Sequence, residues 1–228
     1  MKRLAPPADF SLPPSFFLTG TSTGVGKTFV AALIISARRR AGLDCVGFKP
    51  LSSGGRDDAR ILHRANERSI PLDAVNPWWF RTPAAPWIAA KMSKREVPLA
   101  AIRQWAKRIG KSAATGPRGV IVEGVGGWRV PISKGYAVSD LARDLDLPVV
   151  VVAANRLGVL NHVRLTIESI ASTGATCAAV ILNAPERIAT RGIAARVTTT
   201  NRRVLESFAD MPRLLEFRHG QRKLISLL

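Results

Sequence analysis

The stretch Gly20-Thr21-Ser22-Thr23-Gly24-Val25-Gly26-Lys27-Thr28 sets the class of this chain. It lies between the apolar run Ser15–Thr19 and an apolar pattern that starts at Phe29. A glycine-rich loop that joins a strand to a helix and ends in Gly-Lys-Thr is typical of a phosphate-binding loop. Its backbone amides and the helix N-terminus would face phosphate, Lys27 would neutralise it, and the Thr28 hydroxyl could bind Mg²⁺. Counted from Gly20, the loop is one residue longer than the usual GxxxxGK[ST] spacing.

Outward from this loop, short apolar runs alternate with longer stretches of helical pattern. Strands are predicted at Ser15–Thr19, Asp44–Lys49, Gly119–Glu123, Pro148–Ala153 and Thr176–Asn183. Helices are predicted at Lys27–Ala41, Asp57–Asn66, Leu99–Gly110, Ser139–Leu145 and Val159–Ser172. Continuously apolar strands need cover on both faces, which a parallel sheet receives from its crossover helices. The sequence therefore predicts an α/β fold, a doubly wound and mostly parallel sheet with helices on both faces, as in P-loop nucleoside triphosphatases.

The length and composition favour one globular domain. The chain has 228 residues, and neither an internal repeat nor an interdomain linker stands out. Residues 1–14 are rich in proline and are expected to form a disordered or extended tail, so a single domain is predicted over residues 15–228. There is no apolar run near the roughly 20 residues of a membrane-spanning helix. Nor does the N-terminus resemble a secretory signal. A cytoplasmic protein without a membrane partner is expected.

The charge balance is strongly basic. Lysine and arginine number 34 against 16 acidic residues, a formal charge of +18. Such a field attracts polyanions, which brings nucleic acid and membrane surfaces into consideration. The bases are scattered, however, and the run Arg38-Arg39-Arg40 ends a predicted helix, where cations complement the helix dipole. We therefore expect attraction of small anionic substrates rather than binding of nucleic acid.

Polar residues follow several of the predicted strands, where a doubly wound sheet binds its ligands. Glu123 ends an apolar run beside a glycine-rich turn, and a carboxylate in such a place needs a partner or a metal. Lys49 could serve the site or be a surface lysine at a strand end. Asp58 could bind a metal or favour a helix N-terminus together with Asp57. Asn183 could contact a ligand or simply turn the chain.

The phosphate loop and four further stretches resemble the dethiobiotin synthetase family. Gly20–Thr28 is similar to that family's Gly-Thr-x-Thr-x-Val-Gly-Lys-Thr loop. The other matches, in chain order, are Gly47–Gly54 with GxKPxxSG, Asp57-Asp58-Ala59 with Ser-Asp-Ala, Val122–Trp128 with VEGAGG, and Leu157–His162 plus Leu182-Asn183 with LGxxNH and a closing Asn. Their occurrence together, over roughly residues 15–185, is far more specific than any single motif.

The resemblance implies an ATP-dependent cyclo-ligase that uses Mg²⁺. It would carboxylate 7,8-diaminononanoate with CO₂ and close dethiobiotin's cyclic urea through a carbamate and a carbamoyl-phosphate-type intermediate. Lys27 and Lys49 would be catalytic, and Thr28, Asp58 and Glu123 would hold the metal. The implied nucleotide-binding residues are Gly24, Val25, Gly26, Lys27, Thr28, Phe29, Asp58, Glu123, Gly124, Val125, Gly126 and Asn183. The implied substrate-binding residues are Thr23, Lys49, Ser53, Gly158 and Asn161.

The resemblance also implies a homodimer. In the family, the helix start that corresponds to Leu157–Asn161 receives the substrate carboxylate of the neighbouring subunit, as helix N-termini can for any anion. This sequence departs from the family at Ser22, where Asp is frequent. Residues 186–228 also lack a Leu-Gly-x-Leu-Pro-like turn, of which Met211-Pro212 is a remnant.

Two alternatives stay open. One is a paralogue of the same fold with a changed substrate or lost activity, which the altered C-terminal part favours. The other is a partitioning-type P-loop ATPase switch that binds DNA or membrane, which the positive charge favours. Those switches carry an additional lysine early in the loop, and Gly20–Gly26 contains none.

Overall fold

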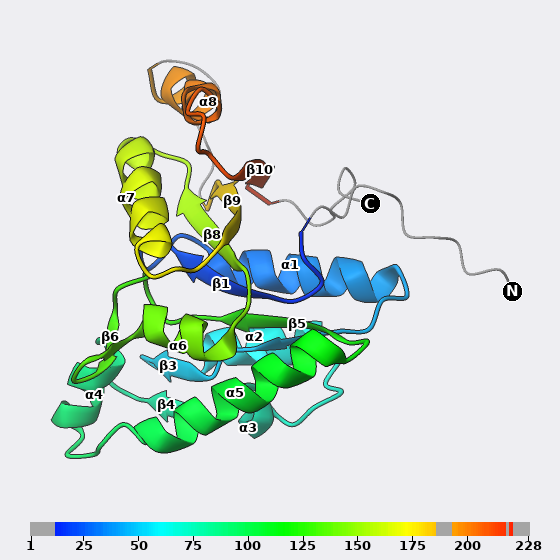
Figure 1. The fold of residues 1–228 in the computed structure, drawn as a ribbon, viewed down its shortest axis with the longest axis vertical. Helices are drawn as coiled ribbons and strands as arrows, with labels where there is room; N and C mark the ends of the chain where they lie inside the picture. The colour runs from blue at the N-terminus through cyan, green and yellow to red at the C-terminus, as the bar shows by residue number, and fades with distance from the viewer. Residues whose placement is uncertain (1–11, 186–192, 218, 221–228) are drawn as a thin grey trace, which may run out of the picture.

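The computed structural model describes residues 12–185, 193–217 and 219–220. Its centre is a six-stranded sheet in the order β10-β9-β8-β1-β5-β2, in which every neighbouring pair is parallel (Figure 1). The strands are β1 (Phe16–Gly20), β2 (Cys45–Phe48), β5 (Gly119–Glu123), β8 (Val149–Ala154), β9 (Cys177–Asn183) and β10 (Arg213–Phe217). Because the strands are parallel, all their carboxyl ends lie at one edge of the sheet. The predicted fold class is confirmed.

Helices cover both faces of this sheet (Figure 1). Side chains of a strand point alternately to opposite faces. Phe16 and Leu18 of β1 accordingly join one apolar core and Phe17 the other. The first core includes α1 (Lys27–Arg40), α2 (Asp57–Ala65) and α3 (Leu72–Val75). The second includes α4 (Pro86–Met92), α5 (Leu99–Thr115), α6 (Val138–Leu145), α7 (Val159–Ala171) and α8 (Ile193–Glu206).

Two small sheets extend the structure beyond the main sheet. β3 (Leu51–Ser53) pairs in parallel with β4 (Trp78–Phe80), and β6 (Pro131–Ser133) pairs antiparallel with β7 (Tyr136–Ala137). The sequence did not predict these strands, because each is too short to show a period of its own. They matter for the site, since β3 follows directly on Lys49.

The predicted strands and helices of the main sheet are all present, and most bounds shift by only a few residues. α5 is the exception, because it continues past Gly110 to Thr115. A side chain at Gly110 would collide with the backbone of Leu145, so this glycine permits close contact between α5 and α6 and does not end the helix. The sequence also missed α3, α4, α8 and β10.

The chain before β1 is held by the end of α1. The guanidinium of Arg38 donates to the carbonyls of Leu12, Pro13 and Pro14 at 3.3, 2.7 and 2.6 Å. Arg38 is buried and lies over the ring of Phe16. The arginine run was expected only to complement the helix dipole. Arg38 also holds the chain before β1 in place. The rest of the expected N-terminal tail, residues 1–11, lies outside the described residues.

Within the described ranges, none of the helices combines the length and the apolar character needed to cross a membrane.

Candidate active site

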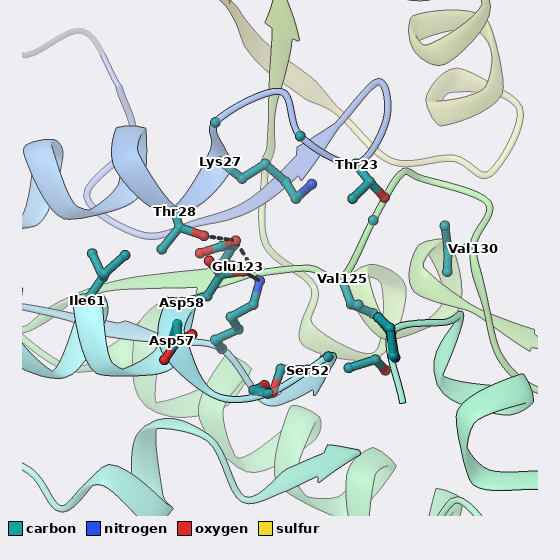
Figure 2. A pocket seen from close by; sticks show the side chains of 18 of the residues that line it. Thr23, Lys27, Thr28, Ser52, Asp57, Asp58, Ile61, Glu123, Val125 and Val130 are labelled. Carbon is teal, nitrogen blue, oxygen red and sulfur yellow. Dashed lines mark hydrogen bonds and ion pairs between the residues drawn. The ribbon is translucent and has the colours of Figure 1, made fainter. Parts of the chain in front are cut away.

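Five side chains of the predicted site meet at the carboxyl edge of the sheet. Lys27 and Thr28 begin α1, Lys49 follows β2, Asp58 lies in the first turn of α2, and Glu123 ends β5. They line one cavity of about 720 Å³ (Figure 2). Other predicted residues on its wall are Thr23, Gly24, Gly26, Phe29, Ser53, Val125 and Gly126. Residues that are far apart in the sequence are thus brought together where a doubly wound sheet binds its ligands.

The phosphate loop has the backbone that its glycines allow. Gly24 and Gly26 have φ angles of +75° and +87°, values that residues with a side chain rarely adopt. A side chain at Gly26 would also collide with Asn183. Gly26 leads directly into α1, so the free amides of the helix N-terminus lie beside the cavity. This geometry suits a phosphate group.

Lys27 is a buried cation in this loop. Its ammonium donates to the carbonyl of Ser22 at 3.1 Å, and the residue is only 7% exposed. Burial and the nearby charge of Lys49 lower the pKa of Lys27 to about 8, against the weaker opposing attraction of Glu123 and Asp58. A polyanion in the cavity would reverse this shift, because it would stabilise the charged form.

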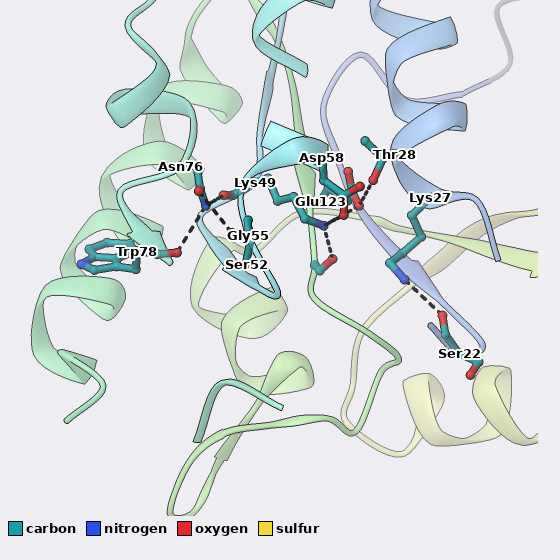
Figure 3. Close-up of polar contacts among 11 residues, drawn as sticks. Ser22, Lys27, Thr28, Lys49, Ser52, Gly55, Asp58, Asn76, Trp78 and Glu123 are labelled. Carbon is teal, nitrogen blue, oxygen red and sulfur yellow. Dashed lines mark hydrogen bonds and ion pairs between the residues drawn. The ribbon is translucent and has the colours of Figure 1, made fainter. Parts of the chain in front are cut away.

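Lys49 is buried and lies at the centre of an ionic cluster (Figure 3). Its Nζ lies 2.6 Å from Glu123 Oε1, 3.3 Å from Asp58 Oδ2 and 3.5 Å from the carbonyl of Gly124. Burial alone would lower the pKa of Lys49, but the two carboxylates outweigh it, so the net shift is upward. Lys49 is therefore held as a cation, and the reading of it as a surface lysine is wrong.

The oxygen atoms around Glu123 fit a magnesium ion. Thr28 Oγ1 donates to Glu123 Oε1 at 2.8 Å, while the buried Glu123 Oε2 has no hydrogen-bond partner among the described residues. With Asp58, these groups form an all-oxygen donor set of the kind that Mg²⁺ prefers. The described residues contain no cluster of three or more His, Cys, Asp or Glu that could hold a metal alone. Water and phosphate oxygens would have to complete the coordination.

Asn183 lies at the end of β9, beside the phosphate loop. Its Nδ2 donates to the carbonyl of Val25 at 2.9 Å, and its buried Oδ1 finds no partner in the part of the chain that the structure describes. The side chain is thus oriented by the loop and retains one free acceptor. Asn183 does not line the cavity itself.

The remaining predicted residues lie in different places. Gly124 is buried and presents its carbonyl to Lys49. Ser53 lines the cavity, and its buried hydroxyl has no hydrogen-bond partner among the described residues. Gly158 and Asn161 lie at the exposed start of α7 and do not line the cavity of their own chain.

Sequence reasoning missed a second group of residues near the site. Ser52, Pro83, Ala84, Ala85 and Val130 also line the cavity. Asn76 contacts Lys49 and Ser52, and Arg56 contacts Asn76. Ser52 lies within Gly47–Gly54, which resembles the family's GxKPxxSG segment, and the other residues belong to none of the matched stretches.

The loop, the buried lysines and the carboxylates on a doubly wound parallel sheet define a P-loop nucleotide-binding protein. The signal recognition particle receptor FtsY from Elizabethkingia anophelis superposes with a TM-score of 0.51 at 15% identity, covering 95% of this chain and 62% of that chain. That likeness supports the fold alone. A family model described as an AAA domain matches residues 15–219.

Sequence relatives specify the class further. The ATP-dependent dethiobiotin synthetase BioD of Akkermansia muciniphila is 40% identical over 207 residues, which cover 91% of this chain and 93% of the relative. The protein of the same name from Anaeromyxobacter dehalogenans is 44% identical over 171 residues, which cover 73% and 75%. This chain therefore belongs to the family of ATP-dependent dethiobiotin synthetases, which are ligases. The resemblance seen in the motifs is confirmed.

Proposed function

We propose that this chain carboxylates 7,8-diaminononanoate with CO₂ and closes the cyclic urea of dethiobiotin, using ATP and Mg²⁺. The observation that carries the proposal is the convergence of Lys27, Lys49, Thr28, Asp58 and Glu123 on one cavity. This arrangement supplies a phosphate cradle, two ammonium groups and an oxygen donor set for a metal.

The reaction needs positive charge at fixed places. One substrate amine adds to CO₂ and loses a proton, which gives a carbamate. A carbamate oxygen then attacks the γ-phosphorus, and ADP leaves. The second amine attacks the carbonyl carbon, the ring closes and inorganic phosphate departs. Phosphoryl transfer is catalysed mainly by positioning and charge stabilisation, so Lys27 and Lys49 would serve both transfer and departure of phosphate.

Binding roles follow from the free polar groups. Backbone amides of the loop Gly24–Thr28 would hold the β- and γ-phosphates, and bound Mg²⁺ would neutralise charge on them. The unpartnered Oδ1 of Asn183 fits the exocyclic amine of adenine. Thr23 and the free hydroxyl of Ser53 would bind the carbamate or the diamine.

A homodimer would complete the site. Gly158 and Asn161 are exposed and lie outside their own chain's cavity, so they are accessible to a second copy. The start of α7 would then receive the substrate carboxylate of the partner. A cytoplasmic location stays a prediction from the sequence.

Diamine-dependent turnover tests the proposal. ADP release should require both diaminononanoate and bicarbonate, and Lys49→Ala should lower turnover by about 100-fold or more while nucleotide binding persists. Lys107→Ala, which removes an exposed lysine of α5, is the matched control and should keep normal turnover.

Other outcomes would favour the alternatives. Unchanged turnover in Lys49→Ala would refute the catalytic assignment. ADP release that responds to DNA or lipid and not to the diamine would favour a partitioning-type switch. Release that responds to none of them would favour an altered or inactive paralogue.

A further inference from the structure

Asn76 is a fully buried amide between α3 and β4, and it contacts the chain on both sides of the site. Its Nδ2 donates to the carbonyls of Lys49 at 2.6 Å and Trp78 at 3.2 Å. Its Oδ1 lies 3.1 Å from Arg56 Nε and 3.2 Å from the Ser52 hydroxyl. Figure 3 shows this side chain directed at the main chain of Lys49, on the side away from Glu123. Three of the four contacts, those with Lys49, Ser52 and Arg56, serve segments that border the cavity.

The main chain of Lys49 depends on this segment for its position. The ladder between β2 and β5 ends at Phe48, so the main chain of Lys49 lies beyond the paired part of the main sheet. Its amide instead donates to the carbonyl of Val75 at 2.9 Å, and its carbonyl accepts from Asn76. Val75 and Asn76 thus bind both the amide and the carbonyl of Lys49.

Arg56 ties the same amide to the rest of the cavity wall. Besides Nε on Asn76 Oδ1, its guanidinium donates to the carbonyls of Asn76 at 3.0 Å and Leu72 at 3.2 Å, and it pairs with Asp73 at 2.8 Å. Arg56 also lies over the ring of Trp79. It directly follows the cavity-lining loop Ser52–Gly55 and is the N-cap residue of α2, two residues before Asp58.

We infer that Asn76 and Arg56 form a positioning clamp, which sets the place of the Lys49 ammonium and of the Ser52–Gly55 loop for the reaction. The inference rests on the proposed function. Neither residue lines the cavity, so they act through Lys49 and the loop rather than on the substrate. Displacement of a reacting group by about 1 Å can lower a rate by about 100-fold, so a clamp of this kind controls turnover more than ATP binding.

Asn66 provides a matched control. It is also fully buried, and it also binds backbone on both sides, since its Nδ2 donates to Gly47 O at 2.9 Å and its Oδ1 accepts from Gly47 N at 2.8 Å. Within the described part of the chain, its side-chain hydrogen bonds reach neither Lys49 nor the Ser52–Gly55 loop. Asn66→Ala should therefore cost stability much as Asn76→Ala does, without displacing the lysine.

The test compares Asn76→Ala, Asn76→Asp and Asn66→Ala in ADP release with diaminononanoate and bicarbonate. Asn76→Asp keeps an acceptor for Arg56 but loses the donor to Lys49. Both Asn76 variants should show kcat lowered by about 100-fold with the KM for ATP changed by less than about 3-fold, and Asn66→Ala should keep kcat within about 3-fold. Wild-type kcat in Asn76→Asp, or an equal loss in Asn66→Ala, would overturn the inference.

Amide hydrogen exchange separates this inference from the proposed function. If the wild-type protein shows no diamine-dependent ADP release, the proposed function fails, and the clamp is then judged on exchange at Lys49 and Gly54–Gly55. Asn76→Ala should speed exchange there by about 10-fold relative to Asn66→Ala, because those amides report local opening of the clamped segment. Equal exchange at these amides in the two variants would overturn the clamp whatever the activity.

Discussion

In the ligand-free protein, the buried position of the Lys27 ammonium lowers the stability of the fold. The phosphate loop places its ammonium in a buried position, close to a second cation, where it donates a hydrogen bond to the carbonyl of Ser22. Desolvation and repulsion both disfavour the charged form. The site is therefore prepared for a polyanion at the expense of stability, as is common for groups in active sites.

Lys27→Met should stabilise the ligand-free protein at neutral pH. The folded pKa of Lys27 is about 8 and the ordinary value is 10.5. Between these values the unfolded chain binds more protons, so wild-type stability rises with pH across that window and does not change through this group below it. The variant should thus be more stable by on the order of 3 kcal/mol below pH 8, with the gain shrinking toward pH 10.5.

Urea unfolding of wild type and Lys27→Met at pH 7 and pH 9.5 measures this difference. The variant should also lose triphosphate binding, because Lys27 is proposed to bind the phosphates. A stability gain that is the same at both pH values would contradict the pKa explanation.

α1 links the phosphate loop to the chain that precedes the first strand. It starts at Lys27 in the site and ends with Arg38, whose guanidinium binds the carbonyls of Leu12, Pro13 and Pro14. These carbonyls flank prolines, which donate no amide hydrogen bonds of their own. Arg38 of the helix therefore supplies hydrogen-bond donors that the prolines of this segment lack.

Arg38→Leu should destabilise the protein through loss of these bonds. Hydrogen bonds to a charged donor contribute about 1.5–3 kcal/mol each, but removal is only partly additive, so we expect a loss of about 2–4 kcal/mol. Arg40→Leu, in the same last turn but exposed, should change stability by less than about 0.5 kcal/mol. Denaturant unfolding followed by tryptophan fluorescence measures both. Equal losses would mean that Arg38 contributes only charge at the helix end.

The net charge of +18 belongs to the complete chain rather than to any site. Several exposed arginines pair with neighbours, such as Arg103 with Asp144 and Arg118 with Asp44, yet bases outnumber acids by two to one. A field of this sign attracts triphosphate and other anions toward the cavity and falls off with ionic strength.

Any binding of duplex DNA by this charge should accordingly be non-specific and confined to low salt. Counterion release makes such binding strongly salt-dependent, so affinity should fall by about 10³-fold or more between 50 and 200 mM salt. DNA should leave ATP turnover unchanged at either salt concentration. Fluorescence anisotropy with a labelled duplex, paired with ADP release, measures both, and DNA-stimulated turnover would revive the switch alternative.

Much of the site was predictable because its motifs are local. The loop Gly20–Thr28 needs particular residues at consecutive positions, and Glu123 combines a charge with an apolar strand, which is conspicuous in a sequence. The same holds for the main strands, whose buried character appears as continuous apolar runs. Arg213–Phe217 lacked that signal, because β10 is an edge strand with exposed Arg213 and Glu216, and it could be placed only through its pairing with β9.

The sequence by itself determined the class of fold, the phosphate loop and the identities of the charged residues at the strand ends. Only the folded chain showed that Lys49 lies between Glu123 and Asp58, that Asn183 keeps a free acceptor beside Gly26, and that Asn76 and Arg56 hold the Lys49 backbone. The reason is that charge, hydropathy and backbone preference act along the chain, whereas the pKa of Lys49 and the position of its ammonium depend on groups contributed by separate elements, which meet only when the sheet has formed.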